Sequence, residues 1–120
     1  MATILIVDDY PVTQRLLSHI LRKFGYDTLS AMNGLEALEL LDAHTVELVI
    51  SDIAMPQMDG ITLLKTLRDD DRYAELPVIM LTASGQDEDR TAAVATGANG
   101  FLTKPASSSE IIDTVHLYLP

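Results

Sequence analysis

The chain has 120 residues, of which 48% are hydrophobic and 22% are charged, and it contains no cysteine. These values fit one folded domain with a single core, and they exclude intrinsic disorder, a disulfide-stabilised scaffold and a membrane-spanning segment. The net charge of −10 repels nucleic acid and anionic lipid, so direct DNA binding and membrane attachment are disfavoured. Since the N-terminus has no basic region and its apolar run is short, no signal peptide is expected, and we predict a cytoplasmic protein.

The first half of the chain predicts strands and helices in alternation. The run 3–7 is almost wholly apolar and rich in Ile, which is typical of a strand covered on both faces. Pro11 suits the first turn of a helix, and an apolar stripe at helical spacing follows, formed by Val12, Leu16, Ile20 and Phe24. A weaker strand is expected at 27–31, and after it a helix with a stripe formed by Leu35, Leu38 and Leu41.

The second half continues the same alternation. Strands are predicted at 47–51 and 77–81, and a weaker one at 100–103. Asp59 stands where a side chain would cap the helix at 61–69, and acidic residues at 87–89 open a further helix. The last helix has a stripe formed by Ile111, Val115 and Leu119. The whole pattern predicts a three-layer (βα)5 fold of the α/β class, with five parallel strands and helices on both faces of the sheet.

Polar side chains stand at four of the five predicted strand ends, although the strands themselves carry almost none. Asp8 and Asp9 follow the first strand, Asp52 follows the third, and Thr82 and Lys104 stand at the ends of the fourth and fifth. In a parallel sheet these ends lie along one edge, where the ligands of open α/β sheets bind. In the flavodoxin-like strand order 2-1-3-4-5 the first and third strands are neighbours, so the three carboxylates should meet at one point.

Three carboxylates at such close range repel one another strongly unless a cation or a proton intervenes. A divalent cation satisfies such a cluster, and Mg²⁺ takes one or two carboxylates while leaving positions for phosphate oxygens. A carboxylate can itself accept a phosphoryl group, with the metal ion and a lysine stabilising the charge in transit. Asp52 stands alone at its strand end and is the best candidate for the acceptor. Lys104 would then neutralise the phosphoryl charge, and the Thr82 hydroxyl would donate to one of its oxygens.

Four segments, VDDYP, SDIAMPQMDG, VIMLTAS and FLTKP, in this order and spacing resemble the receiver domain of bacterial two-component response regulators, the fold of the chemotaxis response regulator. The resemblance covers essentially all of residues 1–120. It implies one receiver domain that accepts a phosphoryl group from a sensor histidine kinase, a phosphotransfer protein or a small phosphodonor. Mg²⁺ would be the cofactor, with Mn²⁺ or Ca²⁺ able to substitute. Such a domain catalyses its own phosphorylation and dephosphorylation and is not a turnover enzyme.

The resemblance also implies roles for individual residues. Asp52 matches the phosphoacceptor, Asp9 a direct ligand of Mg²⁺, and Asp8 a member of the acidic pocket that acts through water or a hydrogen bond. The backbone carbonyl of Ala54 would be a further metal ligand. Thr82 matches the hydroxyl residue that moves toward the phosphoryl group, and Lys104 its ion-pair partner.

Signal output is implied at the face formed by the fourth helix, the fifth strand and the fifth helix, toward an output domain, another protein or a second copy in a homodimer. Phe101 matches the aromatic switch residue of the family, and without a tyrosine hydroxyl its signal must come from ring burial and packing. Pro105 matches a proline whose preceding peptide bond is cis in the family, which would aim Lys104 into the pocket. Kinase recognition is implied around Val12, Leu16 and His19.

Three alternatives remain open. A Mg²⁺-dependent phosphatase with an aspartyl intermediate usually has a second carboxylate two residues beyond the nucleophile, where this chain has Ala54, so turnover of external substrates is disfavoured. A flavin or dinucleotide carrier needs a phosphate-binding loop rich in Gly or Ser/Thr after the first strand, where this chain has acidic residues. A degenerate receiver that acts only as a binding module would fail to bind Mg²⁺.

Overall fold

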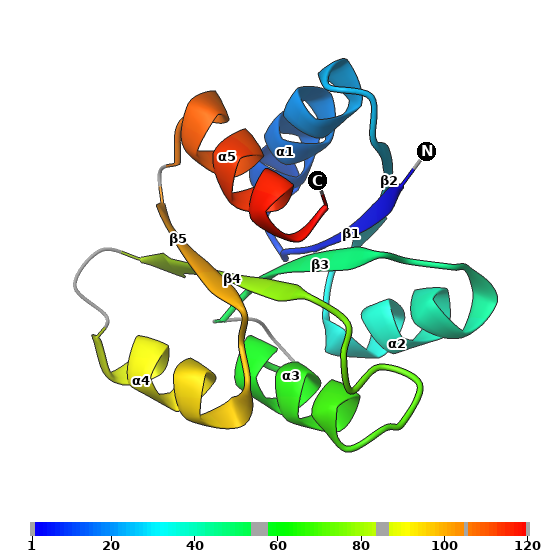
Figure 1. The fold of residues 1–120 in the computed structure, drawn as a ribbon, viewed down its shortest axis with the longest axis vertical. Helices are drawn as coiled ribbons and strands as arrows, with labels where there is room; N and C mark the ends of the chain where they lie inside the picture. Colours follow the sequence, from blue (N-terminus) through cyan, green and yellow to red (C-terminus); the bar gives the residue numbers. More distant parts are fainter. Residues whose placement is uncertain (1, 54–57, 84–86, 105, 120) are drawn as a thin grey trace.

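The computed structural model shows five parallel strands alternating with five helices (Figure 1). It describes residues 2–53, 58–83, 87–104 and 106–119, without the side chains of residues 83 and 87–90. The strands are β1 (Thr3–Val7), β2 (Asp27–Ala31), β3 (Leu48–Asp52), β4 (Val78–Ala83) and β5 (Gly100–Lys104). The helices are α1 (Pro11–Lys23), α2 (Gly34–Ala43), α3 (Gly60–Arg68), α4 (Asp87–Thr96) and α5 (Ser108–Tyr118).

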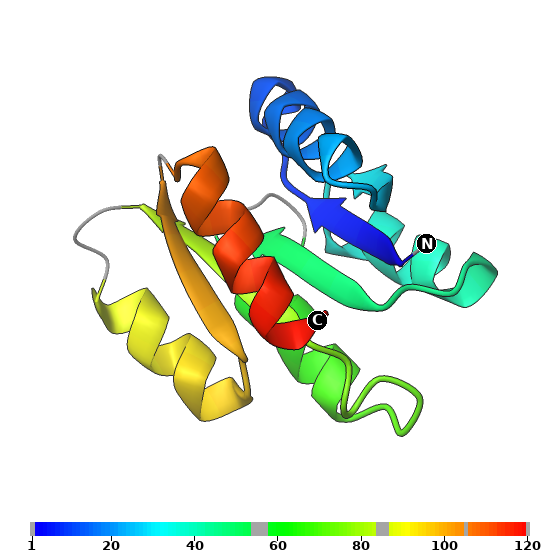
Figure 2. The same ribbon diagram turned by 45° about the horizontal axis from the view of Figure 1, so that its top comes forward.

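The sheet order β2-β1-β3-β4-β5 confirms the predicted flavodoxin-like fold. Every neighbouring pair of strands is parallel. Helices α1 and α5 cover one face of the sheet, and α2, α3 and α4 cover the other (Figures 1 and 2). The strand order reverses at β1 and β3, so the carboxyl ends of these two strands flank the switch point where ligands of such sheets bind.

The core consists of two clusters of buried side chains, one on each face of the sheet. Because successive side chains of a strand point to opposite faces, Ile4 and Ile6 of β1 pack beneath α1 and α5, whereas Leu5 and Val7 pack on the side of α2 and α3. All four side chains are fully buried. A strand that is covered on both faces needs an apolar residue at every position, which explains the nearly continuous apolar runs of the sequence.

The apolar stripe that helical spacing indicates in α1 is not the face that packs on the sheet. Val12, Leu16 and Phe24 are half exposed, at 50%, 53% and 54%, and only Ile20 of the predicted stripe is buried. The side chains that pack against the sheet are Leu17, Ile20 and Leu21. Because α1 carries apolar residues on more than one face, two stripes that share Ile20 are equally consistent with helical spacing. The structure therefore places the stripe of Val12 and Leu16 at the surface.

The other helices agree better with the sequence pattern. In α2, Leu35 is also exposed, and the buried residues are Gly34, Ala37 and Leu41. In α5, Ile111 and Val115 are buried as predicted. Asp59 caps α3 as predicted, since its carboxylate accepts a hydrogen bond from the backbone N–H of Thr62 at 2.8 Å. None of the helices in the described ranges combines the length and apolar character that a membrane crossing requires.

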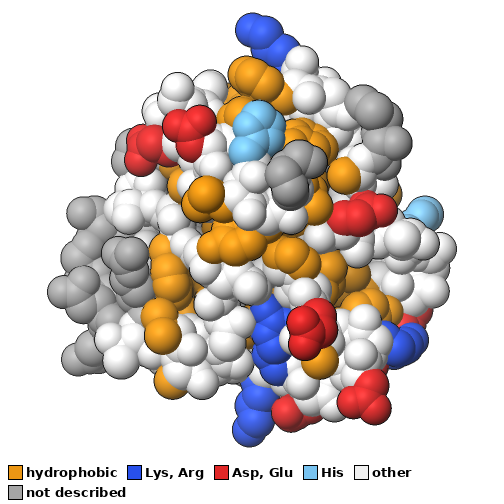
Figure 3. Space-filling model, viewed as in Figure 1, with side chains coloured by type: hydrophobic (Ala, Val, Ile, Leu, Met, Phe, Trp, Pro, Cys, Tyr) orange, Lys and Arg blue, Asp and Glu red, His pale blue; other side chains and the backbone are white. Residues whose placement is uncertain are grey.

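Apolar side chains also reach the surface where the ends of α1 and α5 meet. Figure 3 shows hydrophobic side chains gathered beside the C-terminal end of the chain. Phe24, Tyr26, Tyr118 and Leu119 help to line a hollow of about 710 Å³ there. This hollow lies at the amino ends of β1 and β2, away from the edge where ligands of open α/β sheets bind.

The packing of α1 predicts unequal effects of two adjacent substitutions. Leu17→Ala should lower the free energy of unfolding by about 2–5 kcal/mol, because it removes a buried side chain and leaves a cavity. Leu16→Ala removes the same atoms from a half-exposed position and should cost less than about 1 kcal/mol. Urea denaturation measures both values, and equal losses would contradict this orientation of α1.

Candidate functional site

The carboxyl ends of three strands bring the predicted site residues together. Asp8 directly follows β1, Asp52 is the last residue of β3, and Lys104 is the last residue of β5. One carboxylate oxygen from each of Asp8, Asp9 and Asp52 lies within 4.8 Å of the others. The three carboxylates predicted to share one point therefore do so, and they form an acidic cluster at the switch point of the sheet.

The ammonium group of Lys104 lies between two members of this cluster. Its Nζ is 3.0 Å from Oδ2 of Asp8 and 3.3 Å from Oδ2 of Asp52. Asp8 is fully buried and Asp52 is 9% exposed, whereas Asp9 is exposed. Three carboxylates and one ammonium leave two net negative charges in the cluster. The site therefore retains enough negative charge to attract a divalent cation.

Two opposing effects act on the pKa of Lys104. Partial burial alone would lower this pKa, but the hydrogen bond that Lys104 donates to Asp8 and the charges of Asp52 and Asp8 outweigh it and raise the pKa above its ordinary value. A lysine whose pKa is raised by folding stabilises the folded protein while it is protonated. This stabilisation is fully present at neutral pH and is lost only when the pH rises through the pKa that Lys104 has in the folded protein. At neutral pH the cluster therefore always contains the positive charge of Lys104.

Backbone contacts hold Asp8 in place at the turn between β1 and α1. Its Oδ1 accepts a hydrogen bond from the backbone N–H of Tyr10 at 2.9 Å. Its own N–H donates to the carbonyl of Ala31 at 3.1 Å, and Nε2 of Gln14 donates to its carbonyl at 2.8 Å. The sequence analysis did not identify Gln14, because a single glutamine one turn into a helix has no distinctive pattern.

Gly60 allows α3 to begin directly against the backbone of Asp52. Its N–H donates to the carbonyl of Ile53 at 2.8 Å. A Cβ atom at this position would lie 2.2 Å from the carbonyl oxygen of Asp52 and 2.8 Å from Cα of Ile53. The sequence analysis recognised Asp59 as the cap of this helix but missed the steric role of the glycine that follows it.

Thr82 and Phe101, the two predicted switch residues, lie on the same side of the sheet. Phe101 of β5 is partly buried against the cluster under α2, α3 and α4, and it is in register with Met80 of β4. Since side chains two residues apart in a strand share a face, Thr82 lies on the face of Met80 and Phe101. Thr82 is 5% exposed and stands near the carboxyl end of β4, beside β3. Thr82, near the acidic cluster, and Phe101, in the side-chain layer that α4 covers, therefore lie on one face of the neighbouring strands β4 and β5.

The chemistry of the acidic cluster fits a hard divalent cation, because carboxylate oxygens are the ligands that Mg²⁺ and Ca²⁺ prefer. Two oxygens bound to the same Mg²⁺ are at most about 4.2 Å apart. The carboxylate oxygens of the cluster lie within 4.8 Å of one another, so small side-chain rotations would bring them close enough to share one ion. Two predicted features fall outside the described residues: the carbonyl ligand of Ala54, and the peptide bond between Lys104 and Pro105.

Comparisons with known proteins agree with this fold. A family model described as response regulator receiver domain matches residues 4–116. An uncharacterised 14.6 kDa protein of Leptolyngbya boryana is 44% identical over 115 residues, which cover 96% of this chain and 88% of the relative. The polar-differentiation response regulator DivK of Brucella anthropi is 33% identical over 117 residues, covering 98% and 95% of the two chains. The crystal structure of the chemotaxis protein CheY4 of Vibrio cholerae matches with a TM-score of 0.93 at 33% identity, covering 98% of each chain.

A flavodoxin-like sheet with an acidic cluster and a lysine at its switch point is the architecture of a signalling receiver. The chain belongs to the response regulator receiver domain family, as its motifs predict. Phosphorylation-based signalling in a two-component system is therefore its class of function.

The close approach at Gly60 predicts a specific loss of stability. Gly60→Ala should lower the free energy of unfolding by about 2 kcal/mol, because the new methyl group overlaps backbone atoms of Asp52 and Ile53. Gly34 offers a comparison, since it is also the first residue of a helix and is buried, and a Cβ there would overlap Cβ, Cγ and Sδ of the Met58 side chain. Gly34→Ala should therefore also lower the free energy of unfolding, but by less than Gly60→Ala, because a side chain can move more easily than the backbone of β3. Equal losses in urea denaturation would show that the backbone contact is unimportant.

Proposed function

We propose that this receiver domain is a switch operated by Mg²⁺-dependent phosphorylation of Asp52. The observation that carries the proposal is the convergence of Asp8, Asp9 and Asp52 within 4.8 Å of one another, with Lys104 in contact with two of them. Membership of the receiver family supports it. In this reading the domain catalyses its own phosphorylation and hydrolysis and is not a turnover enzyme.

Burial and contacts distinguish the three carboxylates. Asp8 is fully buried, and its two oxygens already accept hydrogen bonds from the Tyr10 N–H and from Lys104. The side chain of Asp52 is 13% exposed and stands at the mouth of the cluster, so a phosphodonor can approach it. Asp9 is exposed and is suited to meet an incoming ion. We therefore assign Asp52 as the acceptor, and Asp8 and Asp9 as the side of the cluster that holds the cation.

The chemical step is a displacement at phosphorus. A carboxylate oxygen of Asp52 forms the new bond to phosphorus, while the bond from phosphorus to the donor group breaks and the donor leaves with that electron pair. Bound Mg²⁺ would supply positive charge to the phosphoryl oxygens during the transfer. Lys104, already 3.3 Å from Asp52, supplies a second positive charge to the same oxygens, and Thr82 donates a hydrogen bond once it moves toward them. Water later hydrolyses the acyl phosphate and restores the carboxylate.

The output step follows from competition for Lys104. The phosphoryl group adds negative charge at Asp52 and draws Lys104 away from Asp8. Thr82 follows, and Phe101, on the same face of the sheet, repacks toward the interior. This shifts the face formed by α4, β5 and α5 between two arrangements, as in other two-state signalling switches. An output domain, another protein or a second copy of the chain would read that face.

The partner that supplies the phosphoryl group is a histidine kinase or phosphotransfer protein in the cytoplasm, and we place its docking surface on α1. Val12 and Leu16 are half exposed although they are apolar, and Tyr10 beside them is 58% exposed. An apolar groove of about 340 Å³ continues from Leu16 between α1 and α5 to Lys104. This exposed stripe, where the family resemblance also implies kinase recognition, therefore offers an apolar contact surface next to the proposed acceptor.

Mass spectrometry of the intact protein tests the assignment of Asp52. After incubation with acetyl phosphate and Mg²⁺, the wild-type chain should gain one phosphoryl group, and it should gain none when the divalent cation is chelated. Asp52→Asn should gain none under either condition, because an amide does not replace the nucleophilic carboxylate. Asp42→Asn, which changes an exposed carboxylate remote from the cluster, should behave as the wild type.

Two outcomes would contradict the proposal. One is an adduct of equal amount on Asp52→Asn, which would place the acceptor elsewhere. The other is the absence of any adduct on a wild-type sample whose Mg²⁺ binding has been verified, because the domain would then be a binding module without phosphoryl transfer.

A further inference from the structure

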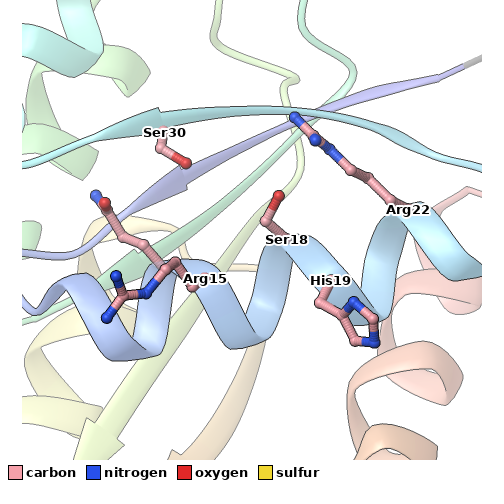
Figure 4. Close-up of a pocket in the computed structure, with 6 residues that line it drawn as sticks. Arg15, Ser18, His19, Arg22 and Ser30 are labelled. Atoms are coloured by element: carbon pink, nitrogen blue, oxygen red, sulfur yellow. The ribbon is translucent and has the colours of Figure 1, made fainter.

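Among the residues that the structure describes, polar side chains line a groove that runs between α1 and the edge strand β2 (Figure 4). Its volume of about 320 Å³ falls within the range of small-ligand sites. Ser18 points from α1 toward β2, where Ser30 lies, and Arg15 and Arg22 stand toward the two ends (Figure 4). The lining residues are Gln14, Arg15, Ser18, His19, Arg22 and Ser30.

The two arginines of this groove lack acidic partners within the described residues. No described carboxylate lies within 4.0 Å of Arg15 or Arg22, although the chain has eighteen acidic residues. Elsewhere, Arg72 and Lys104 form ion pairs, and Arg68 donates to backbone carbonyls. Two uncompensated guanidinium groups in one groove create a local positive potential on a protein whose net charge is −10.

Hydrogen bonds hold the walls of the groove together. The hydroxyl oxygens of Ser18 and Thr28 are 2.8 Å apart, and Nε of Arg22 donates to the Thr28 hydroxyl at 3.0 Å. Nε2 of Gln14 donates to the carbonyl of Ala31 at 2.7 Å, which closes one end against β2. The bond to Thr28 uses Nε of Arg22, so its two terminal nitrogens are the atoms that would face a ligand.

We propose that this groove binds an oligophosphate, an anion with two or three linked phosphoryl groups. Arg15 and Arg22 are seven residues apart on α1, about 10 Å along the helix axis, so a chain of phosphoryl groups can contact both while a single phosphate contacts one. Guanidinium groups bind phosphate oxygens in a bidentate manner, and the hydroxyls of Ser18 and Ser30 supply donors between them. Among the described lining residues, His19 has the only ring that could stack on a nucleobase, and this ring points away from Ser18 and Ser30 (Figure 4), so we expect the phosphates to carry the recognition.

This site shares Gln14 with the contacts that hold Asp8, but its proposed ligand groups lie outside the acidic cluster, and its test does not depend on phosphorylation of Asp52. Inorganic tripolyphosphate is the probe, titrated into ¹⁵N-labelled protein at constant ionic strength in a buffer free of divalent cations, so that no metal ion can bridge the probe to the acidic cluster. Saturable shifts are expected at the amides of residues 14–22 and 28–30. The affinity should exceed that for inorganic phosphate by at least about tenfold, since a second charge-assisted contact is gained.

Variants on both walls test which residues carry the binding. The double variant Arg15→Gln with Arg22→Gln should lose at least about tenfold in affinity, and Ser30→Asp, which adds a negative charge on β2, should also weaken binding. Lys23→Gln removes the same charge from the same helix outside the groove and should change the affinity by less than about twofold. Amide spectra of the free variants verify that each is folded.

Three results would overturn the proposal. The first is a loss of tripolyphosphate affinity in Lys23→Gln equal to that in the double arginine variant. The second is an affinity for citrate equal to that for tripolyphosphate. The third is the absence of saturable shifts up to about 10 mM tripolyphosphate, because a dissociation constant above this value is too weak for specific binding. The first two would show general attraction of anions to the basic side of α1, and the third would show that the groove is an ordinary solvated surface.

Discussion

The repulsion among three carboxylates at one edge of the sheet is the constraint on which the other features of the site depend. The strand order places the ends of β1 and β3 side by side, so the backbone positions that carry Asp8, Asp9 and Asp52 cannot separate without disrupting the sheet. Lys104 offsets part of the charge from the end of β5, and its raised pKa keeps it protonated at neutral pH. Two formal negative charges remain, and carboxylate oxygens are the ligands that hard divalent cations prefer.

The rest of the fold holds this unfavourable arrangement in place. Strands that are buried on both faces give the carboxylates a rigid base, and Gly60 lets α3 pack directly on the backbone of Asp52. Apolar surface that the core does not use lies beside the site on α1, at Val12 and Leu16. The same helix carries the polar groove on its side facing β2. One helix thus presents an apolar surface and a basic groove, and both lie next to the acidic cluster at the strand ends.

The fold and most of the acidic cluster could be predicted from the sequence, because the carboxyl ends of parallel strands all lie at one edge of the sheet. Asp8, Asp52 and Lys104 each stand at the end of an apolar run, and knowing that the strands are parallel is enough to bring them together. The buried face of α1 could not be predicted, since apolar residues lie on several of its faces and only the contact with the sheet selects Leu17 over Leu16. The polar groove was also missed, because it depends on which side chains of β2 lie opposite α1. The ligand role of Ala54 and the conformation before Pro105 stay predictions.

Mg²⁺-dependent thermal unfolding of the wild type and of Asp9→Asn tests the central claim most directly. If the cluster is held together against its own repulsion, Asp9→Asn should be at least as stable as the wild type without divalent cation, because it removes one of the three charges. Mg²⁺ should raise the melting temperature of the wild type. The corresponding increase in the free energy of unfolding should reach about 2.7 kcal/mol when the Mg²⁺ concentration is one hundred times the Kd for Mg²⁺. The melting temperature of Asp9→Asn should rise much less. An equal response of both proteins to Mg²⁺, beyond the response to NaCl of the same ionic strength, would contradict a cation site built on these three carboxylates.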